Sequence, residues 1–510
     1  MRPCLNVREG FDNLMIRSPL EALRRMRRTR TQVVITRSAV AALVVGALAG
    51  CGGVSAQPSA VKGTVAGVPN TSPLAGIQDD RVYQVPAAEA EDRVEAMARM
   101  GSRIIRVDTR WDLIATRRPK NPKDQNDPAY DWTAYDTIVD AAAKRGVRVL
   151  MTVWGTPAWA ADRSVARSKR YPDFARRPRR AGDYGNFAYA LASRYAPRGV
   201  RDWEMWNEPN IPLFLRPQYK KQRGKWVNVS TGTYSNLAKS FYKNVKKVDK
   251  RSRIAGVVTS PAGDQCPSSC PKSANARTSP SNFLKGLNRK GRRPPMNVVS
   301  HHPYPITRPR TRNFPRSSYI DLYNINRFQS EVDRTYLRRK KLWLTEFGFS
   351  TKKVGEYSLY VSEAQQAQYL QDAYRRVRPN RRIRMFVWYF LQDNAQWGSG
   401  LLREDAKPKP AAKVFSIPMA PLSAAPVRRG GTATLVGQVR TARKATKVTV
   451  QQRRIGVWSP LKRVTTSRDG SFALRVRPGS TTAYRATWTG DVPSGSRQTR
   501  TSRPVTVRVR

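Results

Sequence analysis

Short apolar runs alternate with amphipathic helical stretches from about residue 73 to residue 417, and this alternation constrains the fold more than any other feature. Residues 101–108 and 147–154 are two such strands, separated by a helix that begins at Asp131 and ends before Gly146. The pattern is typical of repeated β-α units around a parallel sheet. Counting a first strand near Val82 gives eight units, which predicts an α/β fold of the (β/α)8 TIM-barrel type. An open doubly wound sheet is the alternative, although no glycine-rich phosphate loop follows an early strand.

The chain loses its helical pattern after the barrel. From Gly430 onward, alternating strands are separated by Gly, Pro, Asp and Ser, which predicts a small all-β, immunoglobulin-like sandwich. Its sequence shows no catalytic constellation, so polymer binding and a passive spacer role both stay open. The predicted boundaries are a barrel over 73–417, a linker over 418–429 and a sandwich over 430–510.

The N-terminal region has the pattern of an export signal. Arginines precede an apolar run from Ala39 to Ala49, which is too short to span a bilayer but fits the core of a signal peptide. The run ends at Leu48-Ala49-Gly50-Cys51, which resembles the lipobox of bacterial lipoproteins, and that resemblance implies lipidation of Cys51. An ordinary cleavage site is the alternative. The predicted segments are a signal peptide over 1–51, with Met26 as a possible true start, and a flexible tether over 52–72. We therefore expect an extracellular protein, anchored to the outer face of the cell membrane or secreted.

The formal charge is +58 at pH 7, because 94 Lys and Arg residues stand against 36 Asp and Glu residues along the whole chain. Such a charge favours polyanions, and anionic lipid headgroups or acidic cell-surface polymers are the expected partners of an exported protein. A general preference for arginine in the genome explains the excess equally well. No zinc-finger spacing or recognition-helix pattern accompanies the charge, so no specific nucleic acid is predicted as a partner.

Cys266 and Cys270 are close in sequence, and in an oxidising compartment a local disulfide is the natural interpretation. A metal site at this pair is less expected, because the only two histidines, His301 and His302, are adjacent and distant from it. We predict no metal and no organic cofactor, and we expect a monomer.

Two glutamates end apolar strands in equivalent ways. In Trp206-Asn207-Glu208-Pro209 the proline cannot continue a sheet ladder, so Asn207 and Glu208 emerge where the strand stops. Glu346 ends the run from Lys341 in the same way, about three β-α units later. In a barrel both would lie at the mouth, where catalytic groups of TIM barrels are found. Two carboxylates that flank a glycosidic bond are the minimum equipment for glycoside hydrolysis.

Trp206-Asn207-Glu208-Pro209 and Thr345-Glu346-Phe347-Gly348 resemble the paired signatures of the clan A glycoside hydrolases, on strands four and seven of a (β/α)8 barrel. The resemblance implies that Glu208 is the acid/base, that Glu346 is the nucleophile and that Asn207 holds the substrate 2-hydroxyl. The further residues that it implies for substrate binding are Arg106 beside the nucleophile, His302 and Tyr304 on strand six, and Trp388 on strand eight, and Trp154 offers another aromatic face for a sugar ring. The motifs are closer to families 39 and 5, and the absence of a third-strand histidine, where Trp154 stands, favours family 39.

The sequence thus predicts a retaining β-glycoside hydrolase acting on an extracellular oligo- or polysaccharide. Basic residues in 163–180 and 266–280 hint at an anionic glycan. A carbohydrate-binding or cell-wall adhesion protein that has lost catalysis is the competing hypothesis, and transglycosylation would use the same residues. Neither the sugar, the linkage, nor exo against endo cleavage follows from the sequence.

Overall fold

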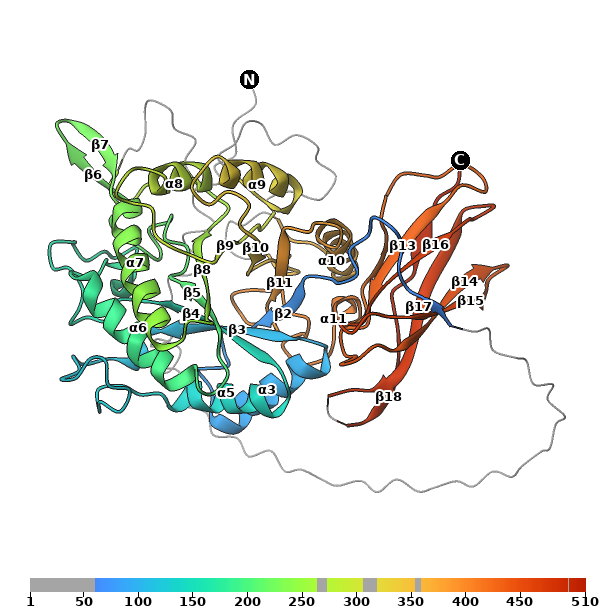
Figure 1. The fold of residues 1–510 in the computed structure, drawn as a ribbon, viewed down its shortest axis with the longest axis horizontal. Helices are drawn as coiled ribbons and strands as arrows, with labels where there is room; N and C mark the ends of the chain where they lie inside the picture. The colour runs from blue at the N-terminus through green and yellow to red at the C-terminus, as the bar shows by residue number, and fades with distance from the viewer. Residues whose placement is uncertain (1–59, 264–272, 306–318, 354–358, 494) are drawn as a thin grey trace.

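Eight parallel strands close into a barrel in the computed structural model (Figure 1). The structure describes residues 60–263, 273–305, 319–353, 359–493 and 495–510. In chain order the barrel strands are β2 (Leu74–Gln78), β3 (Ile104–Arg110), β4 (Arg148–Trp154), β5 (Asp202–Met205), β8 (Arg253–Thr259), β9 (Val298–His301), β10 (Leu342–Leu344) and β11 (Ile383–Tyr389). Strand β11 pairs with both β10 and β2, which closes the sheet. The predicted (β/α)8 barrel is therefore confirmed.

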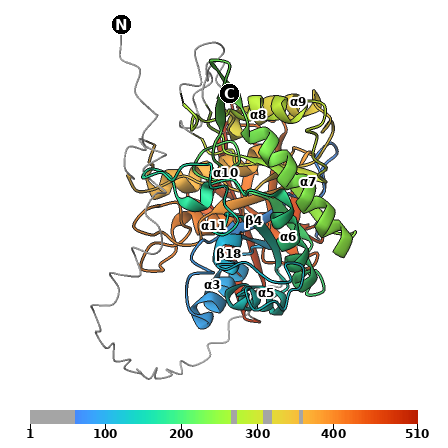
Figure 2. The same ribbon diagram turned by 90° about the vertical axis from the view of Figure 1, so that its left-hand side faces the viewer.

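Helices cover the outside of the barrel, and α6 and α7 run side by side along it in Figure 2. Their bounds are α3 (Ala87–Arg99), α4 (Trp111–Ile114), α5 (Thr133–Lys144), α6 (Ala181–Tyr195), α7 (Ser230–Val248), α8 (Pro280–Leu287), α9 (Ile325–Asp333), α10 (Glu363–Val377) and α11 (Pro410–Ser416). The start of α10 shows why a helix begins where it does. Ser362 accepts a hydrogen bond from the Gln365 backbone, and the Gln365 side chain accepts one from the Ser362 N–H, which satisfies two helix-end donors. None of the helices in the described part of the chain is both long and apolar enough to cross a membrane.

Strand alternation sorts the barrel side chains into an inner and an outer layer. The inner layer is the small cluster Ile104, Leu150, Ala255, Val298, Trp343, Met385 and Val387. The outer layer is much larger and lies between strands and helices. On β11, Met385 and Val387 therefore point inward, while Phe386 and Trp388 point outward. The same parity directs Tyr389 toward the barrel mouth.

The first barrel strand is not where the sequence pattern places it. The prediction set it near Val82, but the strand is Leu74–Gln78 and Val82 lies in the following turn. Gly76 interrupts the apolar pattern of the true strand. A Cβ at Gly76 would lie 2.8 Å from the Ile104 carbonyl oxygen, so close packing against β3 accounts for the glycine.

The C-terminal region forms two sheets that share one hydrophobic core, and all their strand pairs except β1 with β15 are antiparallel. The larger sheet has the order β1-β15-β14-β17-β18, with β19 also on β17, and the smaller has the order β12-β13-β16. The bounds are β1 (Val61–Lys62), β12 (Met419–Pro421), β13 (Ala433–Gln438), β14 (Lys447–Arg454), β15 (Val457–Thr465), β16 (Ser471–Val476), β17 (Thr482–Asp491), β18 (Arg497–Thr501) and β19 (Val505–Val507). The two-sheet core agrees with the expected all-β region, and an immunoglobulin-like arrangement stays a prediction.

Two of these strands come from segments predicted as tether and linker. Strand β1 lies in the tether and pairs parallel with β15, while β12 lies in the linker and pairs with β13. The Gln371 side chain on α10 donates to the Met419 carbonyl, and Arg103 donates to the Arg440 carbonyl. The C-terminal sheets are therefore packed on the barrel rather than strung from it. Cys51, Cys266 and Cys270 lie outside the described residues, so the lipid anchor and the disulfide stay predictions.

Candidate active site

Glu208 and Glu346 meet at the mouth of the barrel. Glu208 follows β5, the fourth barrel strand, and Glu346 follows β10, the seventh. One oxygen of each carboxyl group and one ring nitrogen of His302 lie within 4.8 Å of one another. Both glutamates are buried, with 6% and 8% of their surface exposed. The structure thus brings together two carboxyl groups from the fourth and seventh barrel strands, which are not neighbours in the sheet.

The backbone bends sharply where β5 ends. Trp206 and Glu208 have positive φ angles of 72° and 36°, a region that residues with a Cβ seldom adopt. The Trp206 side chain is fully buried and donates from Nε1 to the Phe214 carbonyl at 2.9 Å, which holds the bend. Asn207 and Glu208 can therefore both reach the mouth although they are neighbours in the chain. Strain of this kind is typical of functional sites.

Arg106 connects the polar residues of the mouth. Its guanidinium donates to Glu204 Oε2 at 2.8 Å, to Glu346 Oε1 at 2.6 Å and to Asn207 Oδ1 at 2.9 Å. Glu204 also accepts from Thr152 and Ser300 hydroxyls, so its buried carboxylate is fully bonded. The predicted contact of Arg106 with Glu346 is present, and the same cation orients the Asn207 amide. Such a fork suits a planar guanidinium and not an ammonium.

Glu346 is held by two donors. Tyr304 donates from its hydroxyl to Glu346 Oε2 at 2.9 Å, while Arg106 contacts the other oxygen. Burial raises the pKa of Glu346, and the Arg106 charge opposes this. Burial also raises the pKa of Tyr304 well above its usual value, so its hydroxyl keeps the proton that it donates. Both donors favour the carboxylate form of Glu346 and so oppose the effect of burial.

Glu208 is buried and faces a histidine ring. Its Oε1 lies 2.8 Å from His302 Nδ1, and His302 is neutral because burial lowers its pKa well below 6.5. Burial raises the pKa of Glu208 to about 8, against the lowering effect of Arg106. Glu208 therefore holds a proton at neutral pH. A protonated carboxyl beside an ionised one is the arrangement that acid catalysis with a nucleophile requires.

The same three side chains, Glu208, His302 and Glu346, have the ligand types that hold divalent metals. Arg106 contacts the Glu346 oxygen that would face such an ion, and its charge would repel a second cation at that oxygen. Tyr304 occupies the other oxygen. The donor set is therefore better matched to a proton shared between two carboxyl groups than to a metal.

The two tryptophans predicted to bind sugar do not offer open faces. Trp388 is fully buried, packs against Phe347 and donates to the Ser399 carbonyl, as its outward parity on β11 dictates. The Trp154 ring is covered by the Arg110 guanidinium, 4.5 Å from the ring centroid. The aromatic platform predicted at Trp388 is therefore not at the mouth. His301, the neighbour of His302, stacks on Phe328 away from the carboxyl pair.

Tyr389 takes the place expected for Trp388. Its ring meets Tyr304 and Trp397 edge to face, with centroids 6.1 Å and 6.4 Å away. Its hydroxyl donates to Asp80 Oδ2 at 2.7 Å. Correct strand parity on β11 would have identified Tyr389 from the sequence.

Asp80 and Asp108 are further residues of the mouth that the sequence analysis missed. Asp80 follows β2, and its position at a strand end was obscured because the first strand was expected near Val82. Asp108 lies on β3 and accepts from Arg106 at 3.3 Å. Both aspartates stand where an apolar strand nears its carboxyl end, which is the same pattern that identified Glu208 in the sequence.

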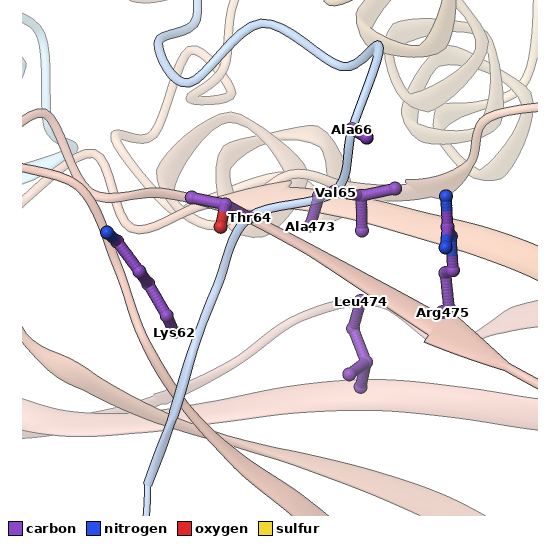
Figure 3. A pocket seen from close by; sticks show the side chains of 7 residues that line it. All are labelled: Lys62, Thr64, Val65, Ala66, Ala473, Leu474 and Arg475. Carbon is purple, nitrogen blue, oxygen red and sulfur yellow. The ribbon is translucent and has the colours of Figure 1, made fainter.

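A separate hollow of about 210 Å³ lies between the N-terminal segment and β16, away from these residues (Figure 3). Its lining consists of Lys62, Thr64, Val65, Ala66, Ala473, Leu474 and Arg475. These side chains include no carboxylate, histidine or thiol, so the hollow has no equipment for acid-base or nucleophilic chemistry. The barrel mouth is the candidate active site.

The candidate active site is thus a pair of buried carboxyl groups at the mouth of a closed (β/α)8 barrel. No protein-family model and no curated protein matches the chain. Among solved structures, an exo-β-1,4-mannosidase from Opitutaceae bacterium strain TAV5 is 15% identical with a TM-score of 0.44, over 68% of this chain and 58% of that one. A glucosidase from Croceicoccus marinus is 11% identical with a TM-score of 0.49, over 81% and 95%.

An endo-β-1,4-mannanase from Thermotoga petrophila is also 11% identical, with a TM-score of 0.41, over 86% of this chain and 98% of that one. The chain spans less than two thirds of the mannosidase. Likenesses at these identities and TM-scores say nothing of the activity of this chain.

Proposed function

We propose that the protein is a retaining β-glycoside hydrolase, with Glu208 as acid/base and Glu346 as nucleophile. The proposal rests on one observation: the two carboxyl groups approach within 4.8 Å across the barrel mouth. Retaining enzymes place these groups about 5–5.5 Å apart, whereas inverting enzymes need about 6.5–9.5 Å to admit a water molecule. The motifs on strands four and seven support clan A, and the end of β4 at Trp154, with no histidine, supports the family 39 side of that clan.

The geometry supports two displacement steps. In the first, a Glu346 oxygen attacks the anomeric carbon while Glu208 gives its proton to the departing glycosidic oxygen, so one C–O bond forms and one breaks. In the second, Glu208 takes a proton from water, whose oxygen attacks the anomeric carbon and releases Glu346. Arg106 neutralises Glu346 before attack and after release, and the Asn207 amide that it orients is placed to bind a substrate hydroxyl.

Covalent trapping tests the proposal. A 2-deoxy-2-fluoro-β-glycoside with a good leaving group should inactivate the protein and add one glycosyl group to the peptide that contains Glu346. Mass spectrometry of the digested protein locates that adduct. An adduct on any other residue, or no adduct with a reagent whose parent glycoside is hydrolysed, would contradict the assignment of the nucleophile.

The pH dependence of turnover should report Glu208. We expect kcat/KM to fall as the pH rises through about 8, because Glu208 then loses the proton that it must donate. In Glu208→Gln this basic limb should disappear when the substrate is a dinitrophenyl glycoside, whose leaving group needs no protonation. Steady-state rates over a pH series measure both profiles. A basic limb that persists in Glu208→Gln would assign the titrating acid to another group.

A further inference from the structure

The β14–β15 hairpin ends in an apolar turn on the side of the C-terminal sheets that lies farther from the barrel (Figure 1). Arg454 pairs with Val457, so Ile455 and Gly456 form a two-residue turn between the strands. Ile455 is fully exposed and Val457 is 68% exposed, and neither belongs to the hydrophobic core between the two sheets. Among the described residues four large apolar side chains are exposed, and two of them stand at this hairpin tip, residues 455–457.

Isoleucine is a costly residue for this turn. The φ angles are 45° at Ile455 and 78° at Gly456, and two positive values in a two-residue hairpin turn are those of type I′. Asparagine, aspartate or glycine fits the first position, whereas a β-branched side chain is strained there. Ile455 therefore favours neither the turn nor contact with water. An exposed and strained apolar side chain of this kind indicates a contact with a partner.

Side chains suited to a lipid–water boundary stand next to the hairpin tip. Arg453 and Arg454 are exposed at the end of β14. Trp458 pairs with Arg453 and is partly buried, and the Arg485 guanidinium lies 4.4 Å from its ring centroid. Tryptophan is enriched where a membrane meets water, and arginine binds phosphate through its planar fork. The order away from the turn is therefore apolar first, then aromatic and cationic.

The C-terminal region has few acidic residues to offset its cations. Residues 430–510 contain 17 Lys and Arg residues against two acidic residues, Asp469 and Asp491, whereas residues 73–417 contain 65 against 31. A general preference for arginine explains an excess of cations but not this shortage of carboxylates. Asp491 ends β17 and Asp469 follows β15, so both lie at the end of the sheet opposite the hairpin tip. The tip therefore presents positive charge to an anionic partner.

The free edge of β15 argues against a second copy of this chain as that partner. In the described residues, β1 covers this edge at Val464 and Thr465. Pro460 has no N–H to donate to another strand, and Lys462 is exposed. Proline and lysine on an edge strand both oppose the addition of a further strand.

The chain enters this sheet from the side of the hairpin tip. Strand β1 runs parallel to β15, so the residues before Val61 approach from the direction of the turn. Cys51, the predicted lipidation site, stands nine residues before Ala60, and nine extended residues span at most about 32 Å. Seven residues separate Val457 from Val464 along β15, a distance of roughly 23 Å. A lipid on Cys51 and the hairpin tip can therefore reach one membrane surface.

We propose that the hairpin tip docks on an anionic lipid surface. Ile455 and Val457 enter the apolar edge of the leaflet, while Arg453 and Arg454 contact lipid phosphates at its surface. A soluble polyanion would use the arginines but would leave the two apolar side chains in water, so the tip favours a membrane. The contact is separate from the predicted lipid on Cys51 and does not depend on the proposed hydrolysis.

Co-sedimentation with lipid vesicles tests the inference. The protein is residues 52–510, which lack the predicted signal peptide and keep every residue that the structure describes. Vesicles of phosphatidylcholine and phosphatidylglycerol in equal parts provide the anionic surface, and phosphatidylcholine alone provides the neutral one. At low salt the protein should bind the anionic vesicles at least about tenfold more tightly, and high salt should remove most of that preference.

Ile455→Asn should weaken binding to anionic vesicles by at least about tenfold, because it removes an apolar side chain from the leaflet. It should melt at no lower a temperature than the parent, since asparagine before glycine suits the turn. Val457→Thr keeps the β-branched shape and should weaken binding by at least about threefold. Leu113→Asn on α4 of the barrel removes another exposed apolar side chain and should leave vesicle binding unchanged.

The arginines are tested together. Arg453→Gln combined with Arg454→Gln should weaken binding to anionic vesicles by about tenfold at low salt and by less at high salt. Retention on immobilised heparin measures binding to a soluble polyanion in the same variants. Ile455→Asn should leave that retention unchanged, because heparin offers no apolar layer.

No binding of the parent protein to anionic vesicles, or unchanged binding in both Ile455→Asn and Val457→Thr, would overturn the inference. Vesicle binding that responds only to the arginine changes would assign these residues to a soluble polyanion instead. A dimer that Ile455→Asn converts to a monomer in sedimentation velocity would assign the tip to a second copy of the chain. Covalent labelling of Glu346 is unaffected by these results, so the proposed hydrolysis stands or fails separately.

Discussion

Replacing Glu346 with alanine should lower the turnover of an aryl β-glycoside by at least about 10⁴-fold while leaving the fold intact. The change removes the carboxyl group that we assign to the glycosyl-enzyme bond. The charge of this group is disfavoured by burial and by the neighbouring carboxyl groups of Glu208 and Asp108, so we expect the variant to stay folded. Initial rates and thermal melting measure the two effects separately.

Azide gives this experiment a stereochemical readout. In Glu346→Ala, azide can enter the space left by the carboxylate and attack the anomeric carbon, which should restore part of the rate and yield the α-glycosyl azide. In Glu208→Ala, azide should instead attack the glycosyl-enzyme and yield the β-glycosyl azide. Proton NMR of the products distinguishes the anomers. Identical anomers from the two variants would contradict the assignment of roles, and Glu204→Ala serves as a control in which azide should rescue nothing.

The sequence predicted the site residues that stand where apolar strands end. Glu208 and Glu346 stand where apolar strands stop, and a closed parallel barrel has one edge at which all such ends meet. Arg106 could also be placed, because it shares a face of β3 with Ile104 in the barrel interior. The positions of these residues follow from the type of element and from the alternation of side chains between the two faces of a strand.

Other residues could not be placed from the sequence pattern, because an error of one position along a strand reverses the face to which a side chain points. Trp388 and Tyr389 are neighbours, and only the inward cluster on β11 reveals which of them faces the mouth. Strand β15 is hard to recognise in the sequence because Pro460 interrupts its pattern, although its bulged pairing with β14 tolerates the proline. Strand β18, Arg497–Thr501, contains no apolar residue at all, and pairing with β17 alone makes it a strand.

Arg106→Met should cost about 3–5 kcal/mol of unfolding free energy, which would make it the most destabilising single change in the mouth. Methionine fills much of the same volume but leaves the buried carboxylates of Glu204 and Glu346 without their cation. Denaturant unfolding measures the loss. The deficit should shrink as the pH falls, because Glu346, whose pKa burial already raises, then becomes neutral in the folded state. Arg106→Lys should lose less stability, since one ammonium still faces Glu346.

A double variant separates stability from catalysis. Adding Glu204→Gln to Arg106→Met removes one of the two unpaired charges, so part of the unfolding free energy should return. Turnover should not return, because Glu346 still lacks the guanidinium that keeps it ionised and Asn207 still lacks its orienting donor. Recovery of both quantities together would mean that Arg106 matters only for folding. Recovery of stability alone would show that one guanidinium holds the barrel interior together through Glu204 and prepares the nucleophile through Glu346.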